Sequence, residues 1–315
     1  MPAPQRHASA TRPIPGRISV AIPVLNAEKY LPTLLPAILN QKPVPPDEVI
    51  LVDSNSTDRT RDIATTFDKV RVIPIARFSH GGSRNLGAAE ATGDVVVFLS
   101  QDATPRGDDW LEKLLIPFED PQVAATYSRQ VPYPDANPME RYFLETHFPP
   151  GLAVRRAKEG HKPLSLHDVF LSNVSAAYRR QALLDHPFDE ELIMSEDQQI
   201  SRDLLNAGYA VVYQPASVVT HSHNYTLNVV FRRYFDSVYS LTLVFPKHDM
   251  GTSASMGFSY LGREFMHMLT KHPLWIPYYA CYTVAKTLGT LAGHFAEAMP
   301  RSWARRCSLH RYHWR

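Results

Sequence analysis

The sequence predicts an α/β fold built on a mainly parallel sheet, and two features of the first 120 residues carry that prediction. Apolar runs rich in Val and Ile recur at 18–24, 48–53, 70–75 and 94–99. Such runs are typical of strands covered on both faces, as in parallel sheets. The segments between them have helical character, and alternation of strands with helices predicts βαβ units.

The helices expected between these strands cover 30–39, 56–67 and 79–93. Pro32 and Pro36 weaken the first, because proline removes a backbone hydrogen bond inside a helix. The third segment contains two adjacent glycines, which predict a turn directly before the helix.

From about residue 130 the pattern changes. The segment 131–150 is rich in Pro and aromatic residues, and 170–180 returns to strand character. Residues 195–215 predict a helix with a polar start, a stop at Gly208 and a further strand. Beyond Asn224 the chain is predicted to be mostly helical.

Length and composition place the chain among ordinary globular proteins. Its 315 residues, 44% hydrophobic and 20% charged, are enough for one large or two modest domains. A net charge of +2 argues against nucleic acid as a partner, and two cysteines favour a reduced, cytoplasmic setting. Residues 1–17 resemble a flexible tail rather than a signal peptide, and no stretch reaches the roughly 20 apolar residues of a spanning helix.

Polar side chains stand where two predicted strands end. Asp53 closes the second strand, and Gln101 and Asp102 follow the fourth. Ligands of open α/β sheets bind at the carboxyl ends of strands, so these positions favour ligand contact. The Asp53 carboxylate could accept a hydrogen bond from the imide N–H of uracil or thymine. The alternative for Asp102 is an acid that caps a turn or a helix.

Three further groups of residues are candidates for ligand binding or catalysis. At 80–85 the glycines and a helix start suit a phosphate, to which Arg84 would add a bidentate contact, although the same glycines can form a plain turn. Glu196 and Asp197 open a helix, where one carboxylate could act as a general base or both could simply complement the helix dipole. Strand alternation would place His221 and His223 on one face, as ligands of a metal or phosphate or as a structural pair.

Five segments, taken in order, resemble glycosyltransferase family 2, the inverting enzymes with the GT-A fold: SVAIPVLNAEKYLPTLLPAI, EVILVDSNSTDRT, GGSRNLGAAEATGDVVVFLSQDATP, SEDQQISRDLLNAGYAVVYQP and HSHNY. FSHGGSRNLGA, FLSQDA and HSHNY resemble in particular its bacterial rhamnosyltransferase branch. The resemblance implies a Rossmann-like, mainly parallel sheet flanked by helices over 18–235. A nucleotide half would cover 18–127 and an acceptor half 128–235, followed by a mostly helical extension at 236–315.

The resemblance also implies roles for single residues. The residues that would bind the nucleotide sugar are Pro23, Asn26, Asp53, Arg84, Gln101 and Asp102. Asp197, next to Glu196, matches the catalytic base of the family's E-D motif.

Metal binding departs from the family pattern at one position. Asp102 matches the last acid of the D-x-D motif, but Ser100 replaces the first. Hard divalent cations prefer oxygen ligands, so one fewer carboxylate should weaken binding of Mg²⁺ or Mn²⁺. His221 or His223 would compensate for the missing acid.

The implied reaction is a single displacement in which Asp197 deprotonates an acceptor hydroxyl. The implied donor is dTDP-rhamnose, and the acceptor a glycan or polyprenyl-linked glycan of cell-surface polysaccharide synthesis. One alternative is a UDP-hexose donor, because base contacts do not separate thymine from uracil by sequence. Another is a non-catalytic sugar-nucleotide-binding protein, which the presence of both Asp102 and Asp197 argues against. A nucleotidyltransferase would need a Gly-rich basic loop after the first strand, where PVLNAEKY stands instead.

The C-terminal segment predicts a peripheral site on the cytoplasmic face of the inner membrane. Its aromatic and apolar residues over 273–299 are Trp275, Tyr278, Tyr279, Tyr282, Leu288, Leu291 and Phe295. Its acid-free end adds Arg301, Arg305, Arg306, Arg311 and Arg315, interleaved with Trp303, Tyr312 and Trp314. Arginines among interfacial aromatics suit an anionic lipid surface. The alternative is a set of helices that pack on the catalytic domain.

Overall fold

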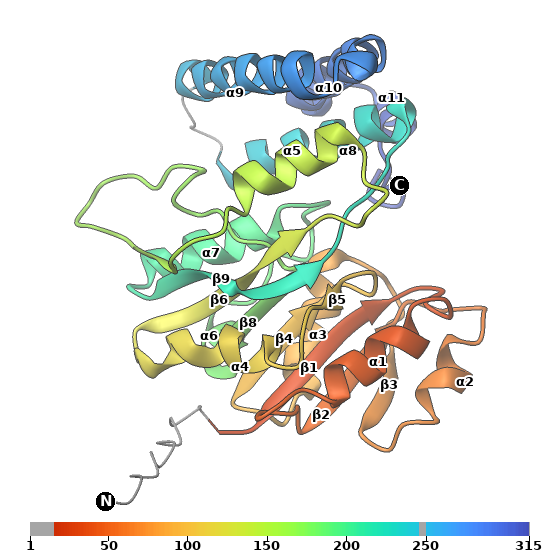
Figure 1. The fold of residues 1–315 in the computed structure, drawn as a ribbon, viewed down its shortest axis with the longest axis vertical. Coiled ribbons are helices and arrows are strands. Elements are labelled where there is room, and N and C mark those ends of the chain that lie inside the picture. The colour runs from red at the N-terminus through yellow and green to blue at the C-terminus, as the bar shows by residue number, and fades with distance from the viewer. Residues whose placement is uncertain (1–15, 246–249, 315) are drawn as a thin grey trace, which may run out of the picture.

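The computed structural model describes residues 16–245 and 250–314, with side chains left undescribed over 250–258. Nearly all of the expected tail at 1–17, and Arg315, lie outside the described residues. One nine-stranded mixed sheet runs through the part of the chain before the C-terminal helices, with helices on both of its faces (Figure 1). The α/β prediction is therefore confirmed.

The first half of the sheet is parallel. Its strands are β1 (Ile18–Val24), β2 (Glu48–Asp53), β3 (Val70–Pro74) and β4 (Val95–Leu99), and its helices are α1 (Leu31–Leu39), α2 (Thr60–Ala64) and α3 (His80–Glu90). β1 lies between β2 and β4, and β3 pairs with β2. The carboxyl ends of β1, β2 and β4 therefore meet at one edge.

The second half extends the same sheet from β4. Its strands are β5 (Thr104–Pro105), β6 (Val123–Val131), β7 (Val154–Ala157), β8 (Ser175–Arg179) and β9 (Ala210–Thr220), and its helices are α4 (Trp110–Leu115), α5 (Pro138–His147), α6 (Arg180–Asp185) and α7 (Glu196–Asn206). β8 pairs antiparallel with β4 and β6, and β6 pairs parallel with β9. This arrangement brings the end of β9 to the end of β4.

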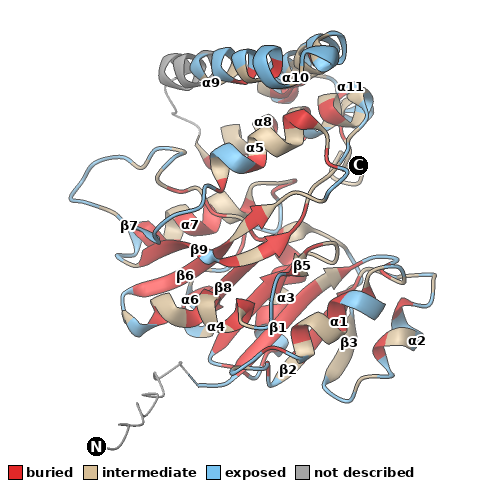
Figure 2. Cartoon of the chain, viewed as in Figure 1, coloured by how far each residue is buried: buried red, intermediate tan, exposed pale blue. Residues whose placement is uncertain are grey.

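Both faces of the sheet are buried, as the apolar strands predict (Figure 2). Along β4, Val95, Val97 and Leu99 pack into the core on one face, whereas Val96 and Phe98 pack into the core on the other. This alternation follows from the two-residue period of a strand. It leaves the strand end as the place where polar side chains reach solvent.

The prolines of α1 do not break that helix. Pro32 occupies the first turn, where no backbone hydrogen bond is needed, and Pro36 lies inside the helix. Leu31, Leu34 and Ile38 are fully buried against the sheet. Their burial offsets the hydrogen bond that Pro36 removes.

The expected glycine turn before α3 is wrong, because the helix already begins at His80. Ser79 caps it by accepting a hydrogen bond from the Gly82 N–H at 3.0 Å. A Cβ atom on Gly81 would lie 2.5 Å from the carbonyl oxygen of Asp189. The glycine is needed for this close approach of two backbones rather than for a turn.

The C-terminal part is helical, as expected. It comprises α8 (Leu227–Val244), α9 (Met250–Lys271), α10 (Ile276–His294) and α11 (Arg301–Cys307). Figure 1 shows α5 and α8 between the sheet and the pair α9–α10. α10 packs closely on α8, since a Cβ on Gly289 or Gly293 would come within 2.4 Å of an α8 carbonyl oxygen. No helix in the described ranges is long and apolar enough to cross a membrane.

The last described residues pack back onto α8 and onto Phe78. The Leu309 N–H donates to the buried Asp236 carboxylate at 2.8 Å. The ring of Trp314 lies 4.8 Å from that of Tyr239, and the ring of Tyr312 lies 5.9 Å from that of Phe78. These two aromatic residues therefore pack on the protein, which contradicts their expected place at a lipid surface. Trp303 remains 65% exposed.

Candidate active site

A pocket of about 560 Å³ opens at the carboxyl end of β4. Residues of both halves and of α8 line it. The charged and titratable side chains among them are His80, Arg84, Asp102, Glu140, Glu196, Asp197, His221, His223, Tyr225, Arg233, Tyr234 and Tyr282. The pocket thus brings together the strand-end acid, the acid pair and the histidine pair that the sequence singled out.

Asp102, His221 and His223 converge in this pocket. One carboxylate oxygen of Asp102 lies 3.6 Å from His221 Nε2, and the other lies 3.5 Å from His223 Nε2. The two Nε2 atoms are 3.0 Å apart. One ligand atom from each residue falls within 4.8 Å of the others, so the three can hold one metal ion.

Gln130 orients His221 for this role. Its side-chain oxygen lies 2.9 Å from His221 Nδ1, while its amide nitrogen donates to Ser172 Oγ at 2.9 Å. Nδ1 therefore carries the proton and Nε2 presents a lone pair. Burial lowers the pKa of His221 to about 4, so the ring is neutral near pH 7.

The expected alternation required both histidines to lie on a strand, but neither of them does. β9 ends at Thr220, and the chain then leaves the sheet. The ring of His223 stacks on the ring of Tyr225, with centroids 4.8 Å apart. The backbone N–H of His223 donates to the Glu140 carboxylate on α5 at 3.2 Å. Contacts with α5 and Tyr225 hold the pair together.

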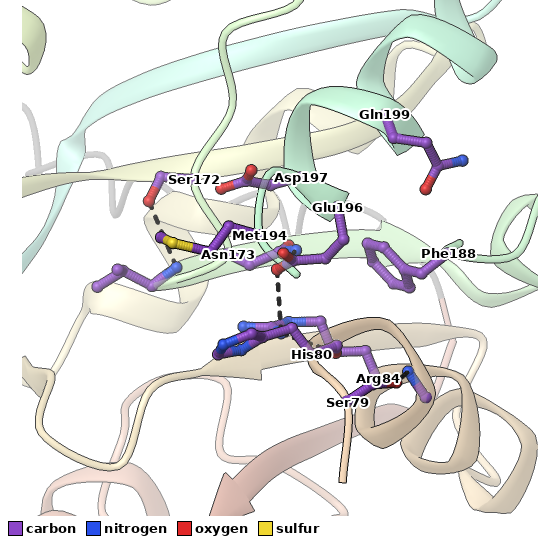
Figure 3. A network of polar contacts seen from close by, with 12 residues as sticks. Ser79, His80, Arg84, Ser172, Asn173, Phe188, Met194, Glu196, Asp197 and Gln199 are labelled. Atoms are coloured by element: carbon purple, nitrogen blue, oxygen red, sulfur yellow. Dashed lines mark hydrogen bonds and ion pairs between the residues drawn. The ribbon is translucent and has the colours of Figure 1, made fainter. Parts of the chain in front are cut away.

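Glu196 and Asp197 begin α7 but face different surroundings. Glu196 is buried, pairs with Arg84 at 3.1 Å and accepts a hydrogen bond from the Asn173 amide at 3.3 Å. Figure 3 shows its side chain directed toward His80 and Arg84. Burial acts to raise the pKa of Glu196, but the charge of Arg84 and smaller contributions lower it overall, so Glu196 is ionised.

Asp197 is the half-buried member of the acid pair and lines the pocket. Burial and the neighbouring charge of Glu196 raise the pKa of Asp197 to about 7. A carboxyl group with such a pKa can accept and release a proton near neutral pH.

Arg84, expected at the nucleotide, is only 7% exposed. Its guanidinium donates to the His80 carbonyl at 2.9 Å and pairs with Glu196. The structure therefore gives Arg84 a partner inside the protein. Its contact with a nucleotide stays a prediction.

Of the other residues expected at the nucleotide, Asp102 lines this pocket, whereas Pro23, Asn26, Asp53 and Gln101 lie at or next to strand ends outside its lining. Asp53 is fully buried and accepts from Ser56 N–H at 3.1 Å and Arg61 Nε at 2.6 Å. The Asn26 side chain accepts from Thr57 N–H at 2.9 Å. The Asn26–Thr57 bond joins the loops after β1 and β2.

Gln101 joins the loop after β1 to the end of β4. Its side-chain oxygen accepts from Leu25 N–H at 2.8 Å, and its amide donates to the Leu25 carbonyl at 3.2 Å. Pro23 is the penultimate residue of β1. Contact of Pro23, Asn26, Asp53 and Gln101 with a nucleotide sugar stays a prediction.

Sequence reasoning missed Arg233, which projects from α8 into the pocket lining. Its guanidinium carbon lies 5.3 Å from the centroid of the Tyr225 ring, within cation–π range. Within the described part of the chain no carboxylate forms an ion pair with it. No motif marks this residue, since only the tertiary structure places α8 over the strand ends.

An acid at the end of β4 that faces a second carboxylate across a pocket in a mixed α/β sheet is the arrangement of a GT-A glycosyltransferase. Residues 19–186 match the family model described as Glycosyl transferase family 2. The chain belongs to glycosyltransferase family 2 and is a glycosyltransferase.

Two similar proteins match along nearly their whole length. The chain is 35% identical over 303 residues to the O-antigen chain rhamnosyltransferase RfbN of Salmonella typhimurium, covering 95% of this chain and 96% of that protein. It is 37% identical over 275 residues to the O-antigen chain rhamnosyltransferase WbaN of Salmonella anatum, covering 85% and 86%.

The fold is shared with solved glycosyltransferases. The mannosyltransferase PcManGT from Pyrobaculum calidifontis, in complex with GDP-Man and Mn²⁺, superposes with a TM-score of 0.57 at 19% identity, covering 93% of this chain and 84% of that chain. Glucosyl-3-phosphoglycerate synthase from Mycobacterium tuberculosis, in complex with Mn²⁺ and UDP-glucose, gives 0.52 at 18% identity, covering 75% and 82%. At this identity the likeness shows the fold alone.

Proposed function

We propose that this glycosyltransferase moves rhamnose from dTDP-rhamnose to a hydroxyl group of a glycan or lipid-linked glycan in cell-surface polysaccharide synthesis. The observation that carries the proposal is the full-length similarity to two O-antigen chain rhamnosyltransferases. The joint presence of Asp102 and Asp197 in one pocket supports catalysis over mere binding.

Asp197 is the proposed general base. It takes the proton of the acceptor hydroxyl, whose oxygen then attacks the anomeric carbon as the bond to the nucleoside diphosphate breaks. Attack from the face opposite the leaving group inverts the anomeric configuration. Glu196 remains ionised beside Arg84 and keeps the pKa of Asp197 high enough for proton transfer.

Asp102, His221 and His223 would hold a divalent ion, and the donor set fits one. Two imidazoles with one carboxylate suit Mn²⁺ better than Mg²⁺, which prefers oxygen ligands and bound water. The ion, when bound, would stabilise the charge that develops on the diphosphate. Arg233 extends from α8 toward the same pocket and would add positive charge there.

Removal of the Gln130 side chain is expected to weaken Mn²⁺ binding by about 10-fold, because the proton of His221 would no longer be fixed on Nδ1. Binding is measured by calorimetry on the full chain. Asp102→Ala should weaken it further, and Gln122→Ala, an exposed glutamine, is the matched control. Equal Mn²⁺ affinity in Gln130→Ala and the wild type would contradict the assigned tautomer and the site.

The donor is tested by the release of nucleoside diphosphate. The full chain is incubated with dTDP-rhamnose, UDP-glucose, UDP-galactose or GDP-mannose and a bacterial lipid-linked glycan extract, with Asp197→Asn as the blank. Release and glycan extension with dTDP-rhamnose alone support the proposal. Turnover of a UDP-hexose in preference to dTDP-rhamnose would overturn the proposed donor while keeping the enzyme class.

We also propose that the protein acts as a peripheral protein on the cytoplasmic face of the membrane, with α10 against the lipid. Four large apolar residues of α10 and its end recur at helical spacing, and each is more than half exposed: Val284, Leu288, Leu291 and Phe295. Gly289 and Gly293, which pack on α8, lie on the opposite face of the helix. Exposed Arg301, Arg305 and Arg306 add charge that suits anionic lipid.

Replacement of Leu288 by glutamate should lower binding to anionic vesicles by about 10-fold, since one buried leucine contributes roughly 1.5–3 kcal/mol. Co-sedimentation of the full chain with vesicles measures the effect. Thr290→Glu adds the same charge to an exposed position of α10 outside the apolar row. Equal losses in the two variants would contradict insertion of this row.

A further inference from the structure

Four arginines line a second hollow, away from the catalytic pocket. Its volume is about 420 Å³, and its lining consists of Arg232 from α8, Ser302, Arg305 and Arg306 from α11, and Arg311 from the returning C-terminal segment. Three separate stretches of the chain therefore bring their guanidinium groups to one place.

Ion pairs do not neutralise this positive charge in the described part of the chain, although burial raises the pKa of Asp236 and the charge of Arg232 acts to lower it. Within the described residues no carboxylate forms an ion pair with any of the four arginines, and Arg232 Nε donates only to the Asn228 side chain at 3.1 Å. Residues 301–315 contain no Asp or Glu. Asp236 on α8 is fully buried and accepts from the backbone N–H groups of Leu309 and His310.

Like charges gathered in one hollow repel one another, so the arrangement favours an anion from outside. Guanidinium groups match phosphate oxygens with paired hydrogen bonds, and several of them around one hollow can bind a phosphate from more than one side. The Ser302 hydroxyl lies in the same lining and can donate a further hydrogen bond.

The hollow is separate from the donor site. Arg233, the residue after Arg232, lines the catalytic pocket, whereas Arg232 does not. Successive residues of an α-helix point about 100° apart, so the side chains of Arg232 and Arg233 lie on different sides of α8. A ligand in the hollow is therefore distinct from the diphosphate of the sugar donor.

We infer that this hollow, which we call the arginine hollow, is a binding site for a phosphate group. The phosphate belongs either to a lipid headgroup at a membrane surface or to a free phosphate compound. Trp303, exposed on α11 between Ser302 and Ala304, is suited to the apolar part of a lipid. The inference depends neither on the sugar nor on the acceptor proposed above.

The test compares single variants of the full chain on two probes. The first probe is a set of phosphatidylcholine vesicles with and without phosphatidic acid, and binding to them is measured by co-sedimentation. The second probe is inorganic pyrophosphate in the presence of EDTA, and its binding is measured by calorimetry. Arg305→Gln and Arg306→Gln are expected to lower affinity for the phosphate probe by about 10-fold each. Arg301→Gln, on the same helix and exposed but outside the hollow, should leave pyrophosphate affinity unchanged and should weaken vesicle binding less than Arg305→Gln does.

The two probes separate the two sources. Arginine-dependent binding to phosphatidic acid vesicles without binding of pyrophosphate assigns the site to a lipid phosphate, and the converse assigns it to a free compound. Failure of both probes to bind the wild type would overturn the inference, as would an equal loss in Arg301→Gln. Unfolding temperature and affinity for dTDP should be unchanged in Arg305→Gln, because Arg305 lies outside the donor pocket, and this separates the outcome from any failure of the proposed reaction.

Discussion

Replacement of Asp197 by asparagine is expected to lower the turnover number by at least about 10²-fold, because an amide cannot take the proton of the acceptor hydroxyl. The isosteric side chain keeps the shape of the pocket, so affinity for the sugar nucleotide should stay near that of the wild type. Steady-state kinetics with a saturating donor, together with calorimetry of nucleotide binding, measure the two effects separately.

The same residue sets the expected pH dependence. With a pKa of about 7, Asp197 is protonated and inactive as a base at lower pH. Turnover should therefore rise with pH through about 7 and level off above it. Activity that is unchanged between pH 5 and pH 8 would contradict the role of Asp197 as the base.

A stability measurement shows whether Asp197→Asn loses turnover because it lacks the base or because it unfolds. A carboxyl group whose pKa is raised on folding makes the protein less stable as pH rises from its ordinary pKa of 3.8 to about 7. Asp197→Asn removes this term, so the variant should be at least as stable as the wild type at pH 8. Near-wild-type turnover in a folded variant would move the role to Glu196 or elsewhere.

Replacement of Arg84 by methionine is expected to destabilise the fold by about 3–5 kcal/mol, the usual effect of leaving one member of a buried ion pair without its partner. Glu196 would remain as a buried carboxylate without its cation. Chemical denaturation near pH 7 measures the loss. The difference from the wild type should shrink as pH falls and Glu196 becomes protonated in the variant.

The variant pair Arg84→Met with Glu196→Gln tests the origin of this effect. Removal of both charges should restore much of the stability that Arg84→Met loses. Arg84 also lowers the pKa of Asp197, so the rise of activity with pH should move to higher pH in Arg84→Met. Unchanged stability combined with lost nucleotide binding would instead favour the nucleotide contact expected from the sequence.

The sequence predicted most of the sheet because its signals are local. The apolar run before Asp102 identifies β4, and the strand-end rule then places Asp102 in the pocket without knowledge of any partner strand. The polar start of α7 likewise located Glu196 and Asp197. The glycines at 81–82 misled this reasoning, because Gly81 is needed for the close approach of the backbone at Asp189, 108 residues further along the chain.

By itself, the sequence determined the α/β class, the order of the elements from β1 to β4 and the acids that meet in the site, since hydrophobic period and strand ends are properties of contiguous residues. Only the tertiary structure decided how the two members of the acid pair differ. Arg84 lies 112 residues before Glu196 along the chain, and the contact that holds Glu196 ionised leaves Asp197 as the group that titrates near pH 7. The return of Tyr312 and Trp314 onto the protein, and the gathering of Arg232 with Arg311, likewise depend on packing between segments far apart in sequence, which no local pattern encodes.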